Sequence, residues 1–451
     1  METLAANNIL SQKHIIEDDV SNPLPPLLIL TEEYPQNETV RFICGQLGVV
    51  LSPIPYVLNL HDNTWDGTFN LIDDTGRVCG KMMLVKGNGS FVDYLVFDTY
   101  TPSHDTQPIL AVEATKVRDG DSRNCAVYQR LTKLRCIKKQ YPGLSTDKII
   151  VRYERPFIIK TSTVRFGIRL LLTMGFGAYD TDGDITTKVS PFKDLDELIH
   201  EKNSIAKPTS GVPVRIKRTE YDTIHISAKL SKGRNTKISH DPNIGLVTGL
   251  IGAIITLDPM IKHVEITDHH VDLDSIARSN AKFWYANSEI DMRLEGSSMS
   301  SLGKTPPSTE YWSKADICEK ASTILFHSLI DNKDMEVIFA NHASSARSSL
   351  KTLDGSYIDL TKKHRIPDIV LRNKSSLHIT VVEGKDFAHI KDGEAQLDDQ
   401  EPFITELQKY YPDHTFDRAL CLAVKTLASI PETRYPVVFA IDNTGSYELR
   451  I

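Results

Sequence analysis

The chain has 451 residues, of which 40% are hydrophobic and 25% charged, a composition typical of globular proteins in solution. The length exceeds what one compact core accommodates, so we expect two or three domains. The net charge of -7 argues against a uniformly basic surface that coats nucleic acid, but a local basic face remains compatible with it.

The cysteines and the N-terminus indicate the cellular compartment. None of the six cysteines forms a Cys-x-x-Cys pair, which disfavours a zinc knuckle or a redox motif and favours free thiols in a reducing cytoplasm. The N-terminus shows no basic-then-apolar leader. The most membrane-like run, Ile244 to Leu257, is too short to span a bilayer. We therefore expect a cytoplasmic protein with no membrane partner.

Composition divides the chain into five segments. Residues 1–40 are polar and proline-rich, which predicts an extended arm. A first core is expected over 41–160 and a middle region over 161–295. Residues 296–309 are rich in Ser, Gly and Pro, which indicates a linker, and a second core is expected over 310–451.

Two apolar runs with acidic residues mark the first core. Phe91–Phe97 has the pattern of a strand with Asp93 inside it, and Ile109–Lys116 that of a strand that ends with Glu113 and Lys116. A polar, turn-rich stretch joins the two runs. We therefore expect a pair of strands that each carry one acid.

A helix is expected next, over Ser122–Gln140, because apolar residues recur there at helical spacing. A further strand is expected over Lys148–Tyr153. The other face of the predicted helix is basic, with Arg123, Arg130, Lys133, Arg135, Lys138 and Lys139.

The middle region concentrates positive charge in a loop-like stretch. Arg and Lys side chains in such a loop suit phosphate contacts, and Arg and Asn suit readout of base edges in the major groove. The alternative is a solvated basic surface. The candidate DNA-binding residues are Lys229, Lys232, Arg234, Asn235, Lys237 and His240. An apolar helix with small residues is expected directly afterwards, from Pro242.

Two short apolar runs near the C-terminus each carry an acid at one end. Ile366–Leu371 contains Asp368, and Leu377–Lys385 closes with Glu383 and Lys385. The short connection lets the strand ends meet, and alternation along a strand places Glu383 and Lys385 on one side. Two carboxylates and an ammonium suit a bound Mg²⁺ ion beside a water. The alternative is a set of ordinary strand-end charges.

This pattern resembles the PD-(D/E)XK signature of restriction-endonuclease-like nucleases. Pro367-Asp368 matches its first half, and Glu383-Gly384-Lys385 its second. The resemblance implies that Asp368 and Glu383 bind metal and that Lys385 orients the attacking water. It also implies that a helix precedes the strands, here expected over Ser313–Asp331. Glu319 on that helix is a candidate further acid, or a solvated helix residue.

The first core departs from this signature. No Pro precedes Asp93, and Lys116 follows Glu113 by three residues, which places it on the opposite face of a regular strand. A bulge or the end of the strand would bring it back. Either Asp93 and Glu113 bind metal and act with Lys116, or this core binds DNA without cutting it.

The resemblance implies a mixed α/β fold with two restriction-endonuclease-like cores, each a central mixed sheet flanked by helices, joined by a DNA-contacting middle region. It implies a Mg²⁺-dependent type II restriction endonuclease that hydrolyses phosphodiester bonds of double-stranded DNA at a specific sequence, with a cognate DNA methyltransferase as a separate protein. A non-catalytic DNA-binding protein with degenerate nuclease folds and a structure-specific repair nuclease are the alternatives. The oligomeric state, including a homodimer, stays open.

Overall fold

The structure is a computed structural model with a mixed α/β fold. It describes residues 26–32, 37–52, 56–58, 68–85, 92–115, 126–154, 156–158, 162–205, 214–228, 242–268, 281–294, 297–298, 321–322, 324–325, 329, 332–340, 350–358, 366–442 and 446–450. The chain forms two compact units. One unit comprises Met1–Ser90, Asp98–Thr101 and Glu310–Ile451, and the other comprises Phe91–Phe97 and Pro102–Thr309.

The polar arm predicted over residues 1–40 is wrong for its second half. Leu28–Thr31 form strand β1, whose four residues are all buried, and helix α2 begins at Asn37 (Asn37–Gln46). The prolines before β1 suggested an arm, but the apolar run after them is long enough to make a buried strand. β1 pairs in parallel with β4 (Val78–Leu84), which pairs with β3 (Thr68–Ile72), and β3 pairs with β2 (Tyr56–Leu58).

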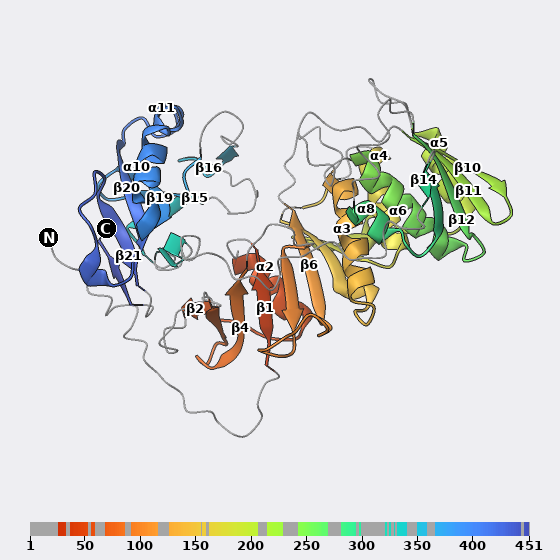
Figure 1. The fold of residues 1–451 in the computed structure, drawn as a ribbon, viewed down its shortest axis with the longest axis horizontal. Coiled ribbons are helices and arrows are strands. Elements are labelled where there is room, and N and C mark those ends of the chain that lie inside the picture. Colours follow the sequence, from red (N-terminus) through yellow and green to blue (C-terminus); the bar gives the residue numbers. More distant parts are fainter. Residues whose placement is uncertain are drawn as a thin grey trace. The chain divides into compact units, whose positions relative to one another are not determined.

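The C-terminal sheet has six strands in the order β15-β18-β19-β20-β21-β22. Their bounds are Met335–Ala340, Ile369–Asn373, His378–Asp386, Thr415–Ala423, Val437–Ile441 and Tyr447–Leu449. Helices α10 (Ile390–Asp398) and α11 (Glu401–Gln408) connect β19 to β20 (Figure 1). A two-stranded hairpin, β16 (Leu350–Lys351) with β17 (Tyr357–Ile358), lies outside this sheet.

Alternating residues of the C-terminal sheet pack against elements on its two faces. Phe403 of α11 packs with Val370 and Val381 on one face. Ile369 and Val382 belong to the cluster on the other face. That cluster also contains the helical residues Ala321, Ile324 and Leu325, which fall within the helix expected over 313–331. The sheet is therefore buried on both faces.

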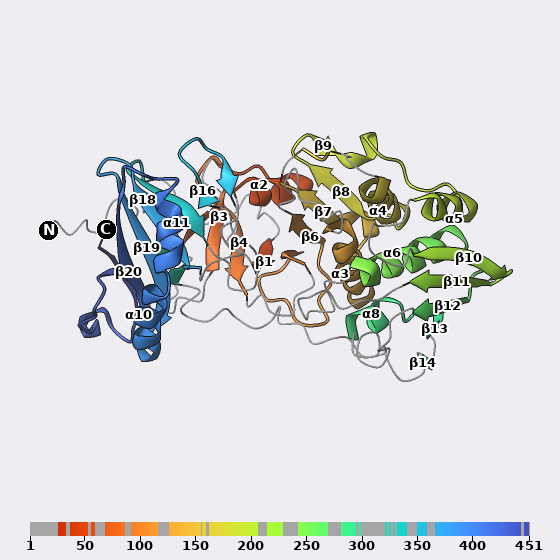
Figure 2. The ribbon, with the colours of Figure 1, turned by 90° about the horizontal axis from the view of Figure 1, so that it is seen from above.

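The other unit contains two sheets with helices between them. The first sheet contributes β5 to β9 to this unit: Tyr94–Phe97, Leu110–Thr115, Ile149–Tyr153, Gly177–Asp180 and Gly183–Asp184. The second comprises β10 to β14: Arg215–Glu220, Thr223–Ala228, His263–Asp268, Asp291–Leu294 and Ser297–Ser298. The helices are α3 (Ala126–Gln140), α4 (Ser162–Thr173), α5 (Leu195–Ser204), α6 (Pro242–Leu257) and α8 (Ala281–Ala286). Figure 2 shows α3, α4, α6 and α8 between the two sheets.

Three series of five strands share one topology. In each, an antiparallel pair is followed by a helical crossover, then by two strands that each pair in parallel with the one before, and last by an antiparallel strand. The three series are β5 to β9, β10 to β14 and β18 to β22. The sequence predicted two similar cores, and the third series became visible only from strand pairing.

Helix α6 packs closely on α3 because its sequence supplies glycine at the contact. A Cβ atom at Gly249 would lie 2.4 Å from Cδ1 of Leu131, and one at Gly252 would lie 2.7 Å from Nη1 of Arg135. Arg135 of α3 is buried here and donates from Nη1 to the backbone carbonyl of Thr248 at 2.9 Å. The apolar helix expected from Pro242 is thus confirmed as a buried helix of this unit.

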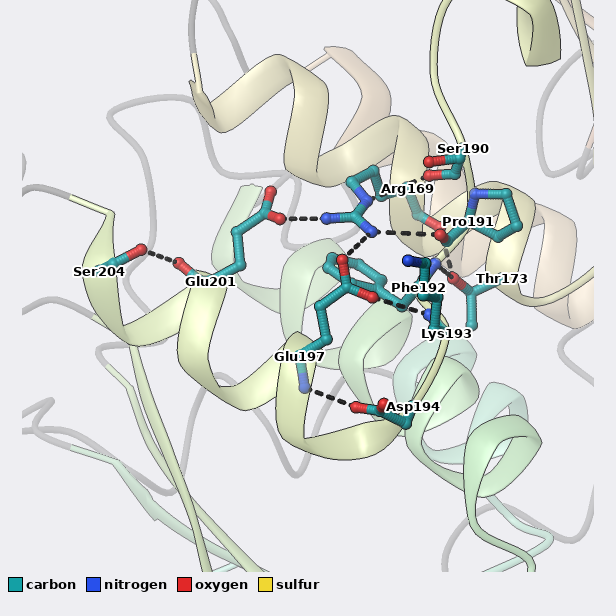
Figure 3. Close-up of polar contacts among 10 residues, drawn as sticks. All are labelled: Arg169, Thr173, Ser190, Pro191, Phe192, Lys193, Asp194, Glu197, Glu201 and Ser204. Carbon is teal, nitrogen blue, oxygen red and sulfur yellow. Dashed lines mark hydrogen bonds and ion pairs between the residues drawn. The ribbon is translucent and has the colours of Figure 1, made fainter.

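A buried arginine, Arg169 of α4, forms hydrogen bonds and ion pairs that connect α4 to α5 (Figure 3). The guanidinium of Arg169 donates to the backbone carbonyls of Ser190 and Pro191, each at 3.1 Å. It also pairs with Glu197 at 2.6 Å and with Glu201. The planar, multi-donor guanidinium therefore satisfies two loop carbonyls and two helix carboxylates at once.

Lys202 at the end of α5 gives a test of stability against pH. Its side chain is buried, and Nζ lies 5.9 Å from the ring centroid of Phe166. Burial, and secondarily the charge of Arg215, lowers the pKa of Lys202 from 10.5 to about 8. Between these two values the unfolded chain binds more protons than the folded one, so this group makes stability rise with pH across that window.

We expect Lys202→Met to raise the free energy of unfolding at pH 7 by about 1–3 kcal/mol, because it removes the cost of burying the ammonium. The gain should shrink as the pH rises above 8. Urea unfolding at pH 7 and pH 9.5 measures it, with the exposed Lys193→Met as the matched control. Equal gains at both pH values would contradict this account of Lys202.

Candidate functional site

The C-terminal site lies where β18 and β19 meet. Ile369 is paired with Val382 in this antiparallel register, so Asp368, the residue before β18, lies opposite Glu383. The Asp368 carboxylate accepts a hydrogen bond at Oδ2 from the backbone N–H of Gly384 at 2.7 Å. The hairpin therefore brings the two acids predicted from the sequence together at one end of the sheet.

Glu383 is held from two sides. Lys385 donates from Nζ to its Oε1 at 2.8 Å, and Gln400 donates from Nε2 to its Oε2 at 3.0 Å. Glu383 and Lys385 thus lie on one face of β19, as their two-residue spacing predicts. Glu383 is buried, with 6% of its surface exposed, whereas Asp368 and Lys385 are half-buried. The site therefore has an open side and a closed side.

The sequence did not point to Gln400. It lies between α10 and α11 and is completely buried. Its Oε1 has no hydrogen-bond partner within the described part of the chain. A buried amide oxygen beside Glu383 adds a third oxygen group to this neighbourhood. Its neighbours became apparent only from the packing of α10 and α11 on the sheet.

The glycine at position 393 lets α10 approach the lysine of the site. A Cβ atom at Gly393 would lie 2.7 Å from Cγ of Lys385. The helix backbone therefore packs over the stem of Lys385, which restricts where its ammonium can lie. The ammonium of Lys385 is thereby held beside Glu383.

The N-terminal site, formed by Asp93 and Glu113, has the same backbone geometry. Tyr94 is paired with Val112, so Asp93 lies opposite Glu113. The Asp93 carboxylate accepts at Oδ2 from the backbone N–H of Ala114 at 2.7 Å. In both hairpins, therefore, the aspartate caps the backbone N–H of the residue that follows the glutamate.

The N-terminal site takes its positive charge from helix α3. Lys133 donates from Nζ to both carboxylate oxygens of Glu113, at 2.8 and 3.0 Å, and Nε of Arg130 lies 3.5 Å from Oε1. Both residues belong to the basic helix face recognised in the sequence, but that pattern did not connect them to Glu113. Lys116, the candidate from the sequence, lies outside the described residues.

Burial distinguishes the two sites. Glu113 is 2% exposed and Asp93 is 5% exposed, so both acids of the N-terminal site are buried. The buried Glu113 carboxylate is paired there with the ammonium of Lys133. The C-terminal site is the more accessible of the two.

The sheet formed by β10 to β14 has no acid at the two positions that correspond to Asp368 and Glu383. Arg215 is paired with Ser227 in the antiparallel pair of β10 and β11, so Val214 lies opposite Ala228. Both residues are buried and apolar. The shared topology is therefore present here without the carboxylate pair.

Several residues singled out in the sequence lie outside the described part of the chain. They are Glu319 and the candidate DNA-binding residues Lys229, Lys232, Arg234, Asn235, Lys237 and His240. The cysteines at 44, 79, 136 and 421 are free and buried, which leaves no exposed thiol among these four. None of the described helices combines the length and apolarity needed to cross a membrane.

The described residues contain no group of three or more His, Cys, Asp or Glu suited to hold a metal ion. Each site instead offers two carboxylates. Mg²⁺ is commonly held by one or two protein carboxylates and keeps several waters, so this donor set fits such an ion. No family model matches the chain, and neither a curated protein nor a solved structure shows significant similarity to it.

Proposed function

We propose that the chain is a Mg²⁺-dependent type II restriction endonuclease with two restriction-endonuclease-like cores, which hydrolyses phosphodiester bonds of double-stranded DNA. One observation carries this proposal. An antiparallel hairpin with opposed Asp and Glu, the Asp bonded to the N–H after the Glu and a lysine bonded to the Glu, occurs twice. A repeated three-part arrangement is poorly explained by ordinary strand-end charges.

The chemistry follows from the C-terminal site. Asp368 and Glu383 would hold the ion, and Gln400 keeps Glu383 in place through its amide. A divalent cation bound there would supply a Lewis acid that offsets phosphate charge and lowers the pKa of water. Lys385, fixed against Glu383, presents N–H donors that orient the attacking water and stabilise charge on the phosphoryl oxygens. Hydrolysis then forms a P–O bond to the water oxygen and breaks the one to the sugar oxygen.

The sheet that contains β10 to β14 would contact DNA without cutting it. Val214 and Ala228 at the positions of the acids leave it without carboxylates for a cation. The basic segment predicted to read DNA, which includes Lys232 and Arg234, directly follows β11. Side chains of this kind position phosphates and read base edges. The proposal therefore assigns DNA cleavage to the strands β5 to β9 and β18 to β22, and DNA recognition to β10 to β14, which lie between them in sequence.

A cleavage assay tests the proposal. Purified protein is incubated with phage DNA and Mg²⁺, with an EDTA sample as the control, and the products are separated on a gel. Discrete bands are expected. A smear, or cutting restricted to junctions, would show a structure-specific nuclease instead. DNA that stays intact with Mg²⁺ while the protein binds it would overturn the proposed activity in favour of a DNA-binding protein.

A further inference from the structure

We propose that Lys133 on α3 is the water-orienting lysine of the N-terminal site, in the role that Lys385 has in the C-terminal site. This inference rests on the proposed nuclease function. It gives that site its amine from a helix, although the sequence placed the lysine on the strand at Lys116.

The strand offers no amine at the equivalent position. β6 pairs in regular register with β7 through Thr115, with no bulge between Ala111 and Thr115. The residue two positions after Glu113 is therefore Thr115, which is buried and occupies the place that Lys385 has after Glu383. Lys116 comes one position later, where regular alternation directs a side chain to the opposite face.

Helix α3 places a positively charged side chain, Lys133, beside Glu113. It follows β6 as α10 follows β19, so the crossover helix passes over the same strand in both sheets. Arg130 and Lys133 are three residues apart and so share the helix face directed at Glu113. The closest Lys133 contact, 2.8 Å, equals that of Lys385 with Glu383.

Exposure favours an active role for Lys133 over a sealed ion pair. The Glu113 side chain is 2% exposed, but that of Lys133 is 26% exposed. The Lys133 side chain is thus partly exposed while its ammonium contacts the buried acid. An ion pair that served stability alone would need no such access, and the corresponding Lys385 side chain is likewise partly exposed, at 17%.

The test rests on the hypothesis that each of the two sites cuts one DNA strand. Asp368→Asn, which should disable the C-terminal site, then serves as the background in which the N-terminal site alone nicks one strand. Adding Lys133→Met is expected to slow that nick by about 10²–10³-fold, within the range for groups that act on protons or charge in the reaction. Adding Lys116→Met is expected to change it less than about threefold, because the inference gives Lys116 no part in the reaction. Nicking of supercoiled plasmid gives both rates.

Two further measurements separate function from folding. Plasmid binding in EDTA should change little in Lys133→Met. The thermal unfolding midpoint should fall, because the buried Glu113 loses a partner, so the nicking rate is compared per folded molecule. A purely structural ion pair would lower the midpoint and spare that rate. If Lys133→Met does not fold, Lys133→Gln, which can still donate to Glu113, takes its place. An unchanged nick in the Lys133 variant, or a lost nick in Lys116→Met, overturns the inference. A wild-type protein that leaves DNA intact overturns the nuclease function itself.

Discussion

Replacing Asp368 by Asn is expected to convert a double-strand cutter into a nicking enzyme. The carboxamide oxygen can still accept the hydrogen bond from the N–H of Gly384, so the hairpin should keep its geometry. The substitution removes the negative charge that would attract the cation. We expect cleavage at the C-terminal site to fall roughly 10³-fold, while the N-terminal site continues to cut its strand.

The products of a supercoiled plasmid measure this directly. Asp368→Asn should accumulate open circles, Asp93→Asn should do the same with the other strand cut, and the double variant should leave the plasmid supercoiled. Asp413→Asn, at an exposed acid near β20, is the matched control and should linearise the plasmid like the wild type. Linear product from Asp368→Asn at the wild-type rate would show that the two sites do not divide the strands.

Of the substitutions proposed, Arg169→Met should lower the free energy of unfolding the most. Met keeps much of the apolar stem but leaves the carbonyls of Ser190 and Pro191 without their donor and leaves Glu197 and Glu201 without their cation. The guanidinium also lies 4.0 Å from the ring centroid of the neighbouring Phe192. Arg169 is buried, but the side chains of Glu197 and Glu201 are 34% and 26% exposed, so we expect a loss of about 1.5–3 kcal/mol.

Urea unfolding followed by circular dichroism measures the change in free energy. Arg165→Met is the matched control, because Arg165 is exposed on the same helix and should change stability by about 0.5 kcal/mol or less. Arg169→Lys should fall between wild type and Met, since an ammonium retains the charge but not the planar set of donors. A loss below about 1 kcal/mol in Arg169→Met would mean that the network contributes little.

Local sequence patterns were sufficient to predict the strands that carry the acids. Alternation and spacing predicted β18 and β19, and they placed Glu383 and Lys385 on one face because side chains on a strand repeat every two residues. The same reasoning found β6 and α3. It failed for β1, where prolines next to a buried apolar run suggested an arm. Patterns of this kind report which surface of an element is buried, but not which element covers it.

The amino-acid sequence by itself determined where acids stand at strand ends and which helices are amphipathic or fully apolar, because these properties depend on neighbours within a few residues. Only the tertiary structure decided that Lys133 contacts Glu113, that Gln400 contacts Glu383, and that a third sheet repeats the topology with Val214 at the position of an acid. Those contacts arise from strand register and from helices that cross between strands, and both are set by long-range packing.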